Sequence, residues 1–132
     1  MADKISFDLV SPEQLLLSED AEMITLPGTE GYFGVLAGHS PLISTLKPGV
    51  IEVKGGADGD RRYFVSTGFA DVSPDKLTVL AEEAIPMESV DTELLNTRIA
   101  NAEEDILQAK TEDARAKAVA HLDALEQLRA LL

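Results

Sequence analysis

The use of glycine and proline changes once along the chain, at Pro86, and this change limits the fold more than any other feature. All nine glycines and six prolines of the 132 residues lie within the first 86 positions. Both residue types interrupt helices and shape tight turns, so long helices are disfavoured before Pro86 and favoured after it. The sequence therefore predicts a β domain over residues 1–87 and a helical domain over residues 88–132.

Short apolar runs separated by turn residues make up the first part. In the first run Ile5, Phe7 and Leu9 alternate with polar Ser6 and Asp8, which predicts a strand with one face in a core. Further strands are expected at residues 21–26, 42–47, 50–54, 63–66, 69–72 and 77–81. Strands of this length with glycine and proline between them are typical of an antiparallel β-sandwich.

Apolar residues recur every three or four positions in the second part. One stripe consists of Leu95, Ile99, Ala102, Ile106 and Ala109. A second stripe consists of Ala114, Ala118, Leu122, Leu125 and Leu128. Thr111, between the stripes, is a candidate N-cap for the second helix. The pattern predicts an antiparallel two-helix hairpin with helices about 30 Å long.

Charge and composition exclude several classes of function. The chain has 24 acidic and 11 basic residues and a formal charge of −13, so its average field repels nucleic acid and anionic lipid. It has no cysteine, which excludes disulfides and thiolate chemistry. No apolar run reaches the ~20 residues of a membrane span, and the N-terminal residues lack the pattern of a signal peptide.

The sequence predicts no metal, cofactor or catalytic site. The run from Gly55 to Asp60 lacks the Gly-Lys-Ser/Thr ending of a phosphate-binding loop and the closing glutamate of a calcium loop. The two histidines, His39 and His121, lie in different predicted domains. One imidazole does not assemble a metal or catalytic centre.

The segment from Leu26 to Leu42, LPGTEGYFGVLAGHSPL, is the most distinctive stretch of the chain. It resembles the Gly-x-x-Gly-(Val/Ile)-Leu-x-x-His-(Ser/Ala)-Pro-Leu pattern of the epsilon subunit of the F-type ATP synthase. Further stretches resemble that family in the same order, at residues 7–13, 21–28, 46–51, 67–72 and 77–82. The resemblance implies a β-sandwich followed by a helical hairpin.

This resemblance also implies a function without catalysis. The family's epsilon subunit belongs to the rotating central stalk, linking the gamma subunit to the membrane c-ring for proton-coupled ATP synthesis. The resemblance assigns the contact with gamma to Ser11, His39 and Ser44. It assigns the contact with the c-ring to a tip formed by Glu30, Gly31, Tyr32 and Phe33. It further implies a peripheral location on the cytoplasmic face of the bacterial inner membrane.

The helical tail is the part that the resemblance brings near the alpha and beta subunits, where it would modulate ATP hydrolysis. Some members carry an (Ile/Leu)-Asp-x-x-Arg-Ala nucleotide motif there. The matching run here is residues 90–95, with Leu94 in place of the arginine. Inhibitory tails have a basic second helix, whereas this one offers Arg115, Lys117 and Arg129 against four acidic residues. We expect neither ATP binding nor strong inhibition.

Two other classes of function stay open from the residues alone. A small β-sandwich enzyme would use His39 with Asp71 or Glu82 as acid–base partners, although no nucleophile, base and orienting group can be recognised together. An adaptor would bind another coiled coil through its hairpin.

The residues assigned to contacts also have structural alternatives. His39 would form a hydrogen bond with nearby backbone in its turn, and Phe33 would pack inward while Tyr32 covers the sandwich edge.

Overall fold

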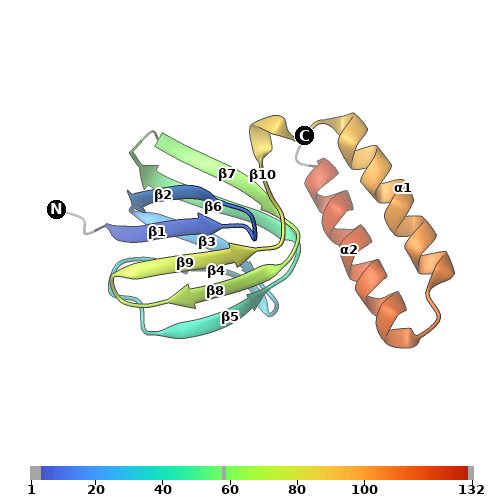
Figure 1. The fold of residues 1–132 in the computed structure, drawn as a ribbon, viewed down its shortest axis with the longest axis horizontal. Coiled ribbons are helices and arrows are strands. Elements are labelled where there is room, and N and C mark those ends of the chain that lie inside the picture. Colours follow the sequence, from blue (N-terminus) through green and yellow to red (C-terminus); the bar gives the residue numbers. More distant parts are fainter. Residues whose placement is uncertain (1–3, 58, 131–132) are drawn as a thin grey trace. The chain divides into compact units, whose positions relative to one another are not determined.

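The computed structural model describes residues 4–57 and 59–130. The chain divides into two compact units between Met87 and Glu88. The first unit consists of β-strands and the second of helices, as Figure 1 shows. The fold class is the predicted one, a β-sandwich followed by a helical hairpin.

Ten strands form the first unit. Their bounds are β1 Ile5–Val10, β2 Leu15–Ala21, β3 Met23–Gly28, β4 Gly31–Val35, β5 Leu42–Leu46, β6 Gly49–Gly56, β7 Gly59–Val65, β8 Gly68–Val72, β9 Lys76–Ala81 and β10 Ala84–Pro86. Paired neighbours follow the order β10-β7-β6-β3-β5-β8-β9-β1-β2, and β4 pairs with β3. We call β5, β8, β9, β1 and β2 the β1 layer, and the other strands the β3 layer (Figure 1).

Alternating residues of both layers form the core of the β unit. Ile5, Phe7 and Leu9 are fully buried, as their spacing predicts. They pack in one cluster with residues of the other strands, including Ile24, Leu26, Ile51, Val53, Leu77 and Val79. Each such side chain stabilises the fold by about 1.5–3 kcal/mol through burial, so the alternation accounts for the sandwich.

One pair of strands in the otherwise antiparallel sandwich is parallel. β1 and β9 run parallel, in register from Ser6↔Lys76 to Val10↔Leu80. A parallel pair needs a long crossover connection, and the intervening strands provide it here. Local turn residues do not reveal such a pairing, because it joins segments far apart in the sequence.

Three strands were not predicted, and one expected strand is interrupted. The expected strand at residues 21–26 is interrupted at Glu22, between β2 and β3. The start of β2 is three consecutive leucines, which do not alternate. The glycines of β4 indicate turns, and β10 has only three residues. Pairing with β1, β3 and β7 therefore forms these strands, rather than local pattern.

A short 3₁₀ turn, Met87–Ser89, spans the boundary between the units, and the second unit continues with α1 Thr92–Gln108 and α2 Glu112–Ala130. The Thr111 Oγ1 accepts a hydrogen bond from the Ala114 N–H at 3.0 Å, so the predicted N-cap is confirmed. Arg129 Nη1 donates to Asn96 Oδ1 at 3.3 Å, joining the end of α2 to the start of α1. The helices are therefore antiparallel.

Burial in the two helices follows the predicted stripes only in part. On α1, Leu95, Ile99 and Ala102 are buried, and on α2, Leu125 and Leu128. Ala114, the first residue of the second stripe, is exposed, because it lies in the first turn of α2 beside the interhelical connection.

None of the described helices is long and apolar enough to cross a membrane.

Candidate functional site

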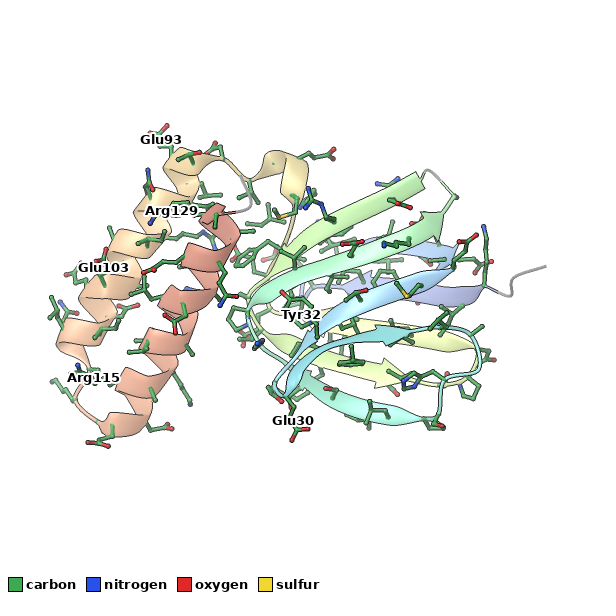
Figure 2. The ribbon with its side chains drawn as sticks, turned by 180° about the vertical axis from the view of Figure 1, so that it is seen from behind. Glu30, Tyr32, Glu93, Glu103, Arg115 and Arg129 are labelled. Carbon is green, nitrogen blue, oxygen red and sulfur yellow. The ribbon has the colours of Figure 1, made fainter. Side chains whose placement is uncertain are left out.

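The tip assigned to the c-ring is the hairpin between β3 and β4. The strands pair from Ile24↔Val35 to Gly28↔Gly31, so Thr29 and Glu30 form a two-residue turn. Gly31 has a φ of 131°, in the region that favours glycine. Glu30 is exposed, and Figure 2 shows it at the outer end of the hairpin.

Tyr32 and Phe33 lie in β4 itself and not at the tip, and they point to opposite sides of the strand. Phe33 is half-buried and packs against the core, so the inward packing considered for it is confirmed. Tyr32 is 52% exposed, yet its hydroxyl accepts a hydrogen bond from the Val50 N–H at 3.1 Å. Lys47 Nζ lies 5.9 Å from the centre of the Tyr32 ring. Tyr32 thus fastens β4 to the start of β6.

Backbone hydrogen bonds hold the same hairpin beside β5. The Thr29 N–H donates to Thr45 O at 3.3 Å, and the Lys47 N–H donates to Pro27 O at 2.9 Å. The pair Gly28↔Leu46 joins the two layers at this point. Glu30 therefore projects from a turn that is fixed on two sides, which suits a residue that must meet a partner in one position.

The three residues assigned to gamma are spread over the β1 layer. Ser11 follows β1 in a turn closed by its own N–H, which donates to Gln14 O at 2.9 Å. His39 precedes β5, which runs in the same direction as β1. Ser11 and His39 therefore lie at opposite ends of the layer, at least about 13 Å apart by the rise of β5. Ser44 is half-buried opposite Ala70, on the core side of β5.

His39 is engaged with its own turn. Its Nδ1 lies 2.7 Å from Ser40 O, and because a carbonyl only accepts, Nδ1 carries the proton and donates it. The Gly38 N–H donates to Pro74 O at 2.7 Å, which holds this loop against the turn between β8 and β9. The backbone contact considered for His39 from the sequence is thus present.

The acid–base partners considered for His39 do not form a site with it. Glu82 follows β9 and lies at the Ser11 end of the layer, away from His39. Asp71 is an exposed residue of β8 opposite Ile43. Within residues 4–57 and 59–130, no three His, Cys, Asp or Glu side chains are grouped to hold a metal ion.

An apolar row crosses the β1 layer on its outer side. The strand pairings align one residue from each of five strands, namely Thr45, Phe69, Leu80, Val10 and Leu15. We call these five residues the outer row. Phe69, Leu80 and Leu15 are 56%, 53% and 57% exposed.

The outer row is not among the features expected from the sequence, although the sequence contains a signal for it. Ala70 and Val72 are buried, so alternation along β8 assigns Phe69 to the solvent side. Leu80 stands between buried Val79 and Ala81 in the same way. Large apolar residues at the solvent-facing positions of two neighbouring strands indicate a surface that a partner covers.

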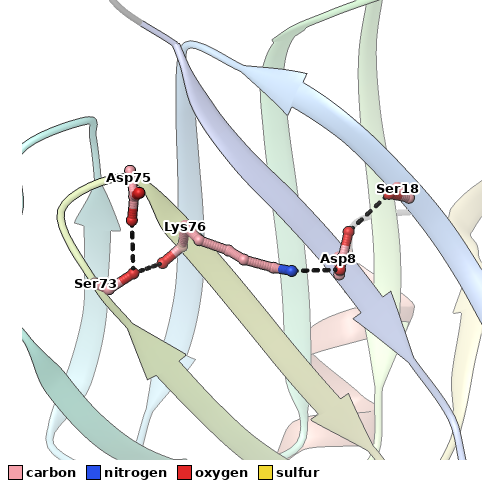
Figure 3. A network of polar contacts seen from close by, with 5 residues as sticks. All are labelled: Asp8, Ser18, Ser73, Asp75 and Lys76. Carbon is pink, nitrogen blue, oxygen red and sulfur yellow. Dashed lines mark hydrogen bonds and ion pairs between the residues drawn. The ribbon is translucent and has the colours of Figure 1, made fainter.

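Two positions further along the strands, the same side of the layer carries the exposed Ile43 on β5 and polar residues on the other four strands. Ser18 Oγ donates to Asp8 Oδ1 at 2.7 Å, and Lys76 Nζ pairs with Asp8 Oδ2 at 3.2 Å (Figure 3). The hydrogen bond from Ser18 is the main reason that the pKa of Asp8 lies below its ordinary value, and the contact with Lys76 lowers this pKa further. In the adjacent turn, the Ser73 hydroxyl is the hydrogen-bond donor to Asp75 Oδ1 and to Lys76 O.

Comparison with known proteins identifies the family. Residues 4–87 match the family described as ATP synthase, Delta/Epsilon chain, beta-sandwich domain. The chain is 48% identical over 129 residues to an ATP synthase epsilon chain of Parvibaculum lavamentivorans, covering 98% of both. It is 46% identical over 128 residues to that of Mesorhizobium japonicum, covering 97% of this chain and 95% of the relative. The chain belongs to the ATP synthase epsilon chain family.

Solved structures of ATP synthases share the fold of this family member. A chain in the cryo-EM structure of the Euglena gracilis mitochondrial ATP synthase, described as OSCP/F1/c-ring, is 31% identical with a TM-score of 0.79. The alignment covers 97% of this chain and 81% of that one. A chain of the Tetrahymena thermophila central stalk/c-ring structure is 14% identical with a TM-score of 0.75, which shows a common fold.

In the tail of this epsilon chain family member, the run that resembles the nucleotide motif caps a helix. Asp91 is the N-cap of α1, and its Oδ1 accepts a hydrogen bond from the Leu94 N–H at 2.7 Å. The Asp91 carboxylate therefore already accepts a hydrogen bond from the first turn of α1. The side chain of Leu94 carries no positive charge that could pair with a phosphate.

Proposed function

We propose that the chain is a non-catalytic subunit of the central stalk of an F-type ATP synthase, where its β unit connects the gamma subunit to the c-ring. The observation that carries this proposal is the identity of 48% to an epsilon chain over nearly the whole of both chains. A rotor part must transmit torque, which needs a rigid body with two separate contact surfaces. The closely packed sandwich with a fixed hairpin at one end fits that need.

The hairpin between β3 and β4 is the proposed contact with the c-ring. Glu30 and the exposed part of Tyr32 would meet the ring loops. Gly31 permits the turn and Phe33 anchors it in the core, so these two act by shaping the hairpin. The four residues thus divide into two that contact the ring and two that position them.

The β1 layer is the proposed contact with gamma. Ser11 and His39 lie at the two ends of this layer. β5 is its last strand, because β5 pairs with β3 only at Gly28↔Leu46, and Ser44 in β5 therefore lies at the margin of the layer. The exposed residues of the outer row lie between these points and would be covered in the complex. In this proposal the chain is a peripheral subunit on the cytoplasmic side of the bacterial inner membrane, where its helices are near the alpha and beta subunits.

Assembly tests this proposal. The full chain should co-purify with gamma, alpha and beta and should restore proton-coupled ATP synthesis to membranes that lack their own subunit. A chain ending at residue 87 should still assemble with gamma, because the core of the β unit is complete by Ala84. Loss of gamma binding in that shortened chain would favour the adaptor instead, and hydrolytic turnover abolished by His39→Ala would favour the enzyme.

A further inference from the structure

We propose that a groove at the Ser11 end of the outer row receives an apolar side chain of the gamma subunit that is flanked by a lysine or arginine. This inference rests on the proposed function, because it takes gamma as the partner. It goes further by naming the anchoring pocket and the chemistry of the gamma segment that fills it.

The groove lies entirely within the β unit and has a volume of about 510 Å³. Its apolar walls come from Val10, Pro12, Leu46, Phe69 and Leu80. A space of this size accepts one or two large side chains. The strands that form it are held by the cross-strand pairs of the outer row, so the groove is formed before any partner arrives.

The exposure of its walls indicates that the groove is normally covered. Phe69 and Leu80 are Cα partners on neighbouring strands, and more than half of each side chain is exposed. Contiguous apolar surface of this kind mostly marks a site of protein interaction. A large aromatic residue beside a pocket is also the usual form of an energetically dominant contact.

Charge selects the partner segment. Among the described residues that line the groove, Glu82 is the only charged one, and it is exposed. The β unit, residues 1–87, has 14 acidic and 6 basic residues, a net charge of −8. A lysine or arginine beside the apolar anchor would pair with Glu82 and would be favoured by this field. A second copy of the chain, itself at −13, would be disfavoured.

Position argues for gamma rather than another subunit. Ser11, the residue assigned to gamma at this end of the layer, lines the groove together with Pro12. A surface of gamma that contacts Ser11 would therefore lie against the wall of the groove. The contact with gamma would then continue along the outer row toward the His39 loop.

Binding of the full chain to a complex of alpha, beta and gamma that lacks this subunit tests the inference. The variants Phe69→Ser and Leu80→Gln should each raise the dissociation constant about tenfold or more, as loss of an interface anchor does. Both residues are exposed, so thermal unfolding should change little. Leu107→Gln is the matched control in a parallel measurement with gamma alone, because Leu107 is 86% exposed on α1, outside the groove, and should leave the affinity for gamma unchanged.

Two further measurements identify the occupant. Glu82→Gln should weaken binding and reduce its dependence on salt concentration, since it removes the proposed ion pair. Replacing Phe69 with the photoreactive p-benzoylphenylalanine should give a crosslink to gamma, at an apolar residue next to a lysine or arginine. This crosslink does not depend on the folding of the other variants.

The outcomes separate the two proposals. If the unchanged chain does not bind gamma, the proposed function itself fails. If it binds gamma with normal affinity after Phe69→Ser and Leu80→Gln, only the groove is ruled out as an anchor. A crosslink to a c subunit, to a second copy or to the helices of the same chain would overturn gamma as the occupant.

Discussion

The hydroxyl of Tyr32 in β4 and the backbone N–H of Val50 in β6 are joined by a hydrogen bond of 3.1 Å. The bond ties the hairpin that carries Glu30 to a strand of the sandwich. It also explains how a half-exposed tyrosine can help to hold two strands together. The roles of Glu30 and Tyr32 can therefore be separated by experiment.

Gly49 is necessary for this arrangement, so Gly49→Ala should destabilise the β unit. A Cβ at Gly49 would lie 2.6 Å from the Tyr32 hydroxyl and 2.7 Å from Pro27 Cβ, both closer than real contacts. We expect a loss of about 1–3 kcal/mol in the free energy of unfolding, as for other overpacked sites. Gly34→Ala in β4 is the control, because its Cβ would meet Met23 Sδ at 3.4 Å, an ordinary contact. Equal stability of the two variants would contradict the fit described for Tyr32.

Asp8 should make the stability of the β unit depend on pH at low pH. Its folded pKa is lowered, chiefly by the hydrogen bond from Ser18, whereas its ordinary value is 3.8. A lowered folded pKa stabilises the fold above the ordinary value, and this contribution is lost as the pH falls below 3.8 through the folded pKa. Denaturant unfolding should therefore give a smaller decrease on acidification for Asp8→Asn than for the unchanged chain.

Ser18→Ala provides a second test of the same site. It removes the donor that contributes most to the shift but leaves the carboxyl and Lys76 in position. The pKa of Asp8, followed by NMR, should rise toward its ordinary value. An unchanged pKa would mean that Lys76 and not Ser18 dominates.

Sequence reasoning succeeded where local pattern and burial coincide. Ile5, Phe7 and Leu9 alternate and are buried, and Thr111 caps α2 as its position predicts. It failed where long-range pairing decides, as in β4, whose two glycines indicate a turn although the strand pairs with β3. Tyr32 and Phe33, which the resemblance assigns to a tip, lie in this strand.

The candidate site was predictable only in part. Glu30 at an exposed turn follows from the glycines and the proline around it. The outer row does not follow from any single segment, because its members come from five strands whose order along the layer includes a parallel pair. Only the register shows that Val10, Phe69 and Leu80 form one surface.

ATP at millimolar concentration should neither raise the melting temperature of the isolated chain nor compact its helices. Asp91 is engaged as the N-cap of α1, and Leu94 supplies no cation for a phosphate. Residues 88–132 have 5 basic and 10 acidic residues, a net charge of −5, which repels the nucleotide. A saturable upward thermal shift would contradict this. Leu94→Arg, which restores the cation of the motif, is the variant in which such a shift should be sought.

Glu30→Lys should weaken the attachment of the catalytic head to membranes, and with it proton-coupled ATP synthesis in inverted vesicles. Glu30 is exposed at the end of a fixed turn, so reversing its charge alters the proposed c-ring contact without disturbing the fold. Adding Tyr32→Asp should weaken attachment further but also lower the melting temperature, because an aspartate cannot reach Val50 as the tyrosine does. Binding to gamma should persist in Glu30→Lys.

Glu103→Lys is the control for this last experiment, since it makes the same charge change at an exposed position of α1. It should leave membrane attachment intact. Normal coupling with Glu30→Lys present at full stoichiometry would remove the hairpin from the c-ring contact. Tyr32, Gly31 and Phe33 would then serve only the fold of the sandwich, and the ring would have to be met by another surface of the β unit.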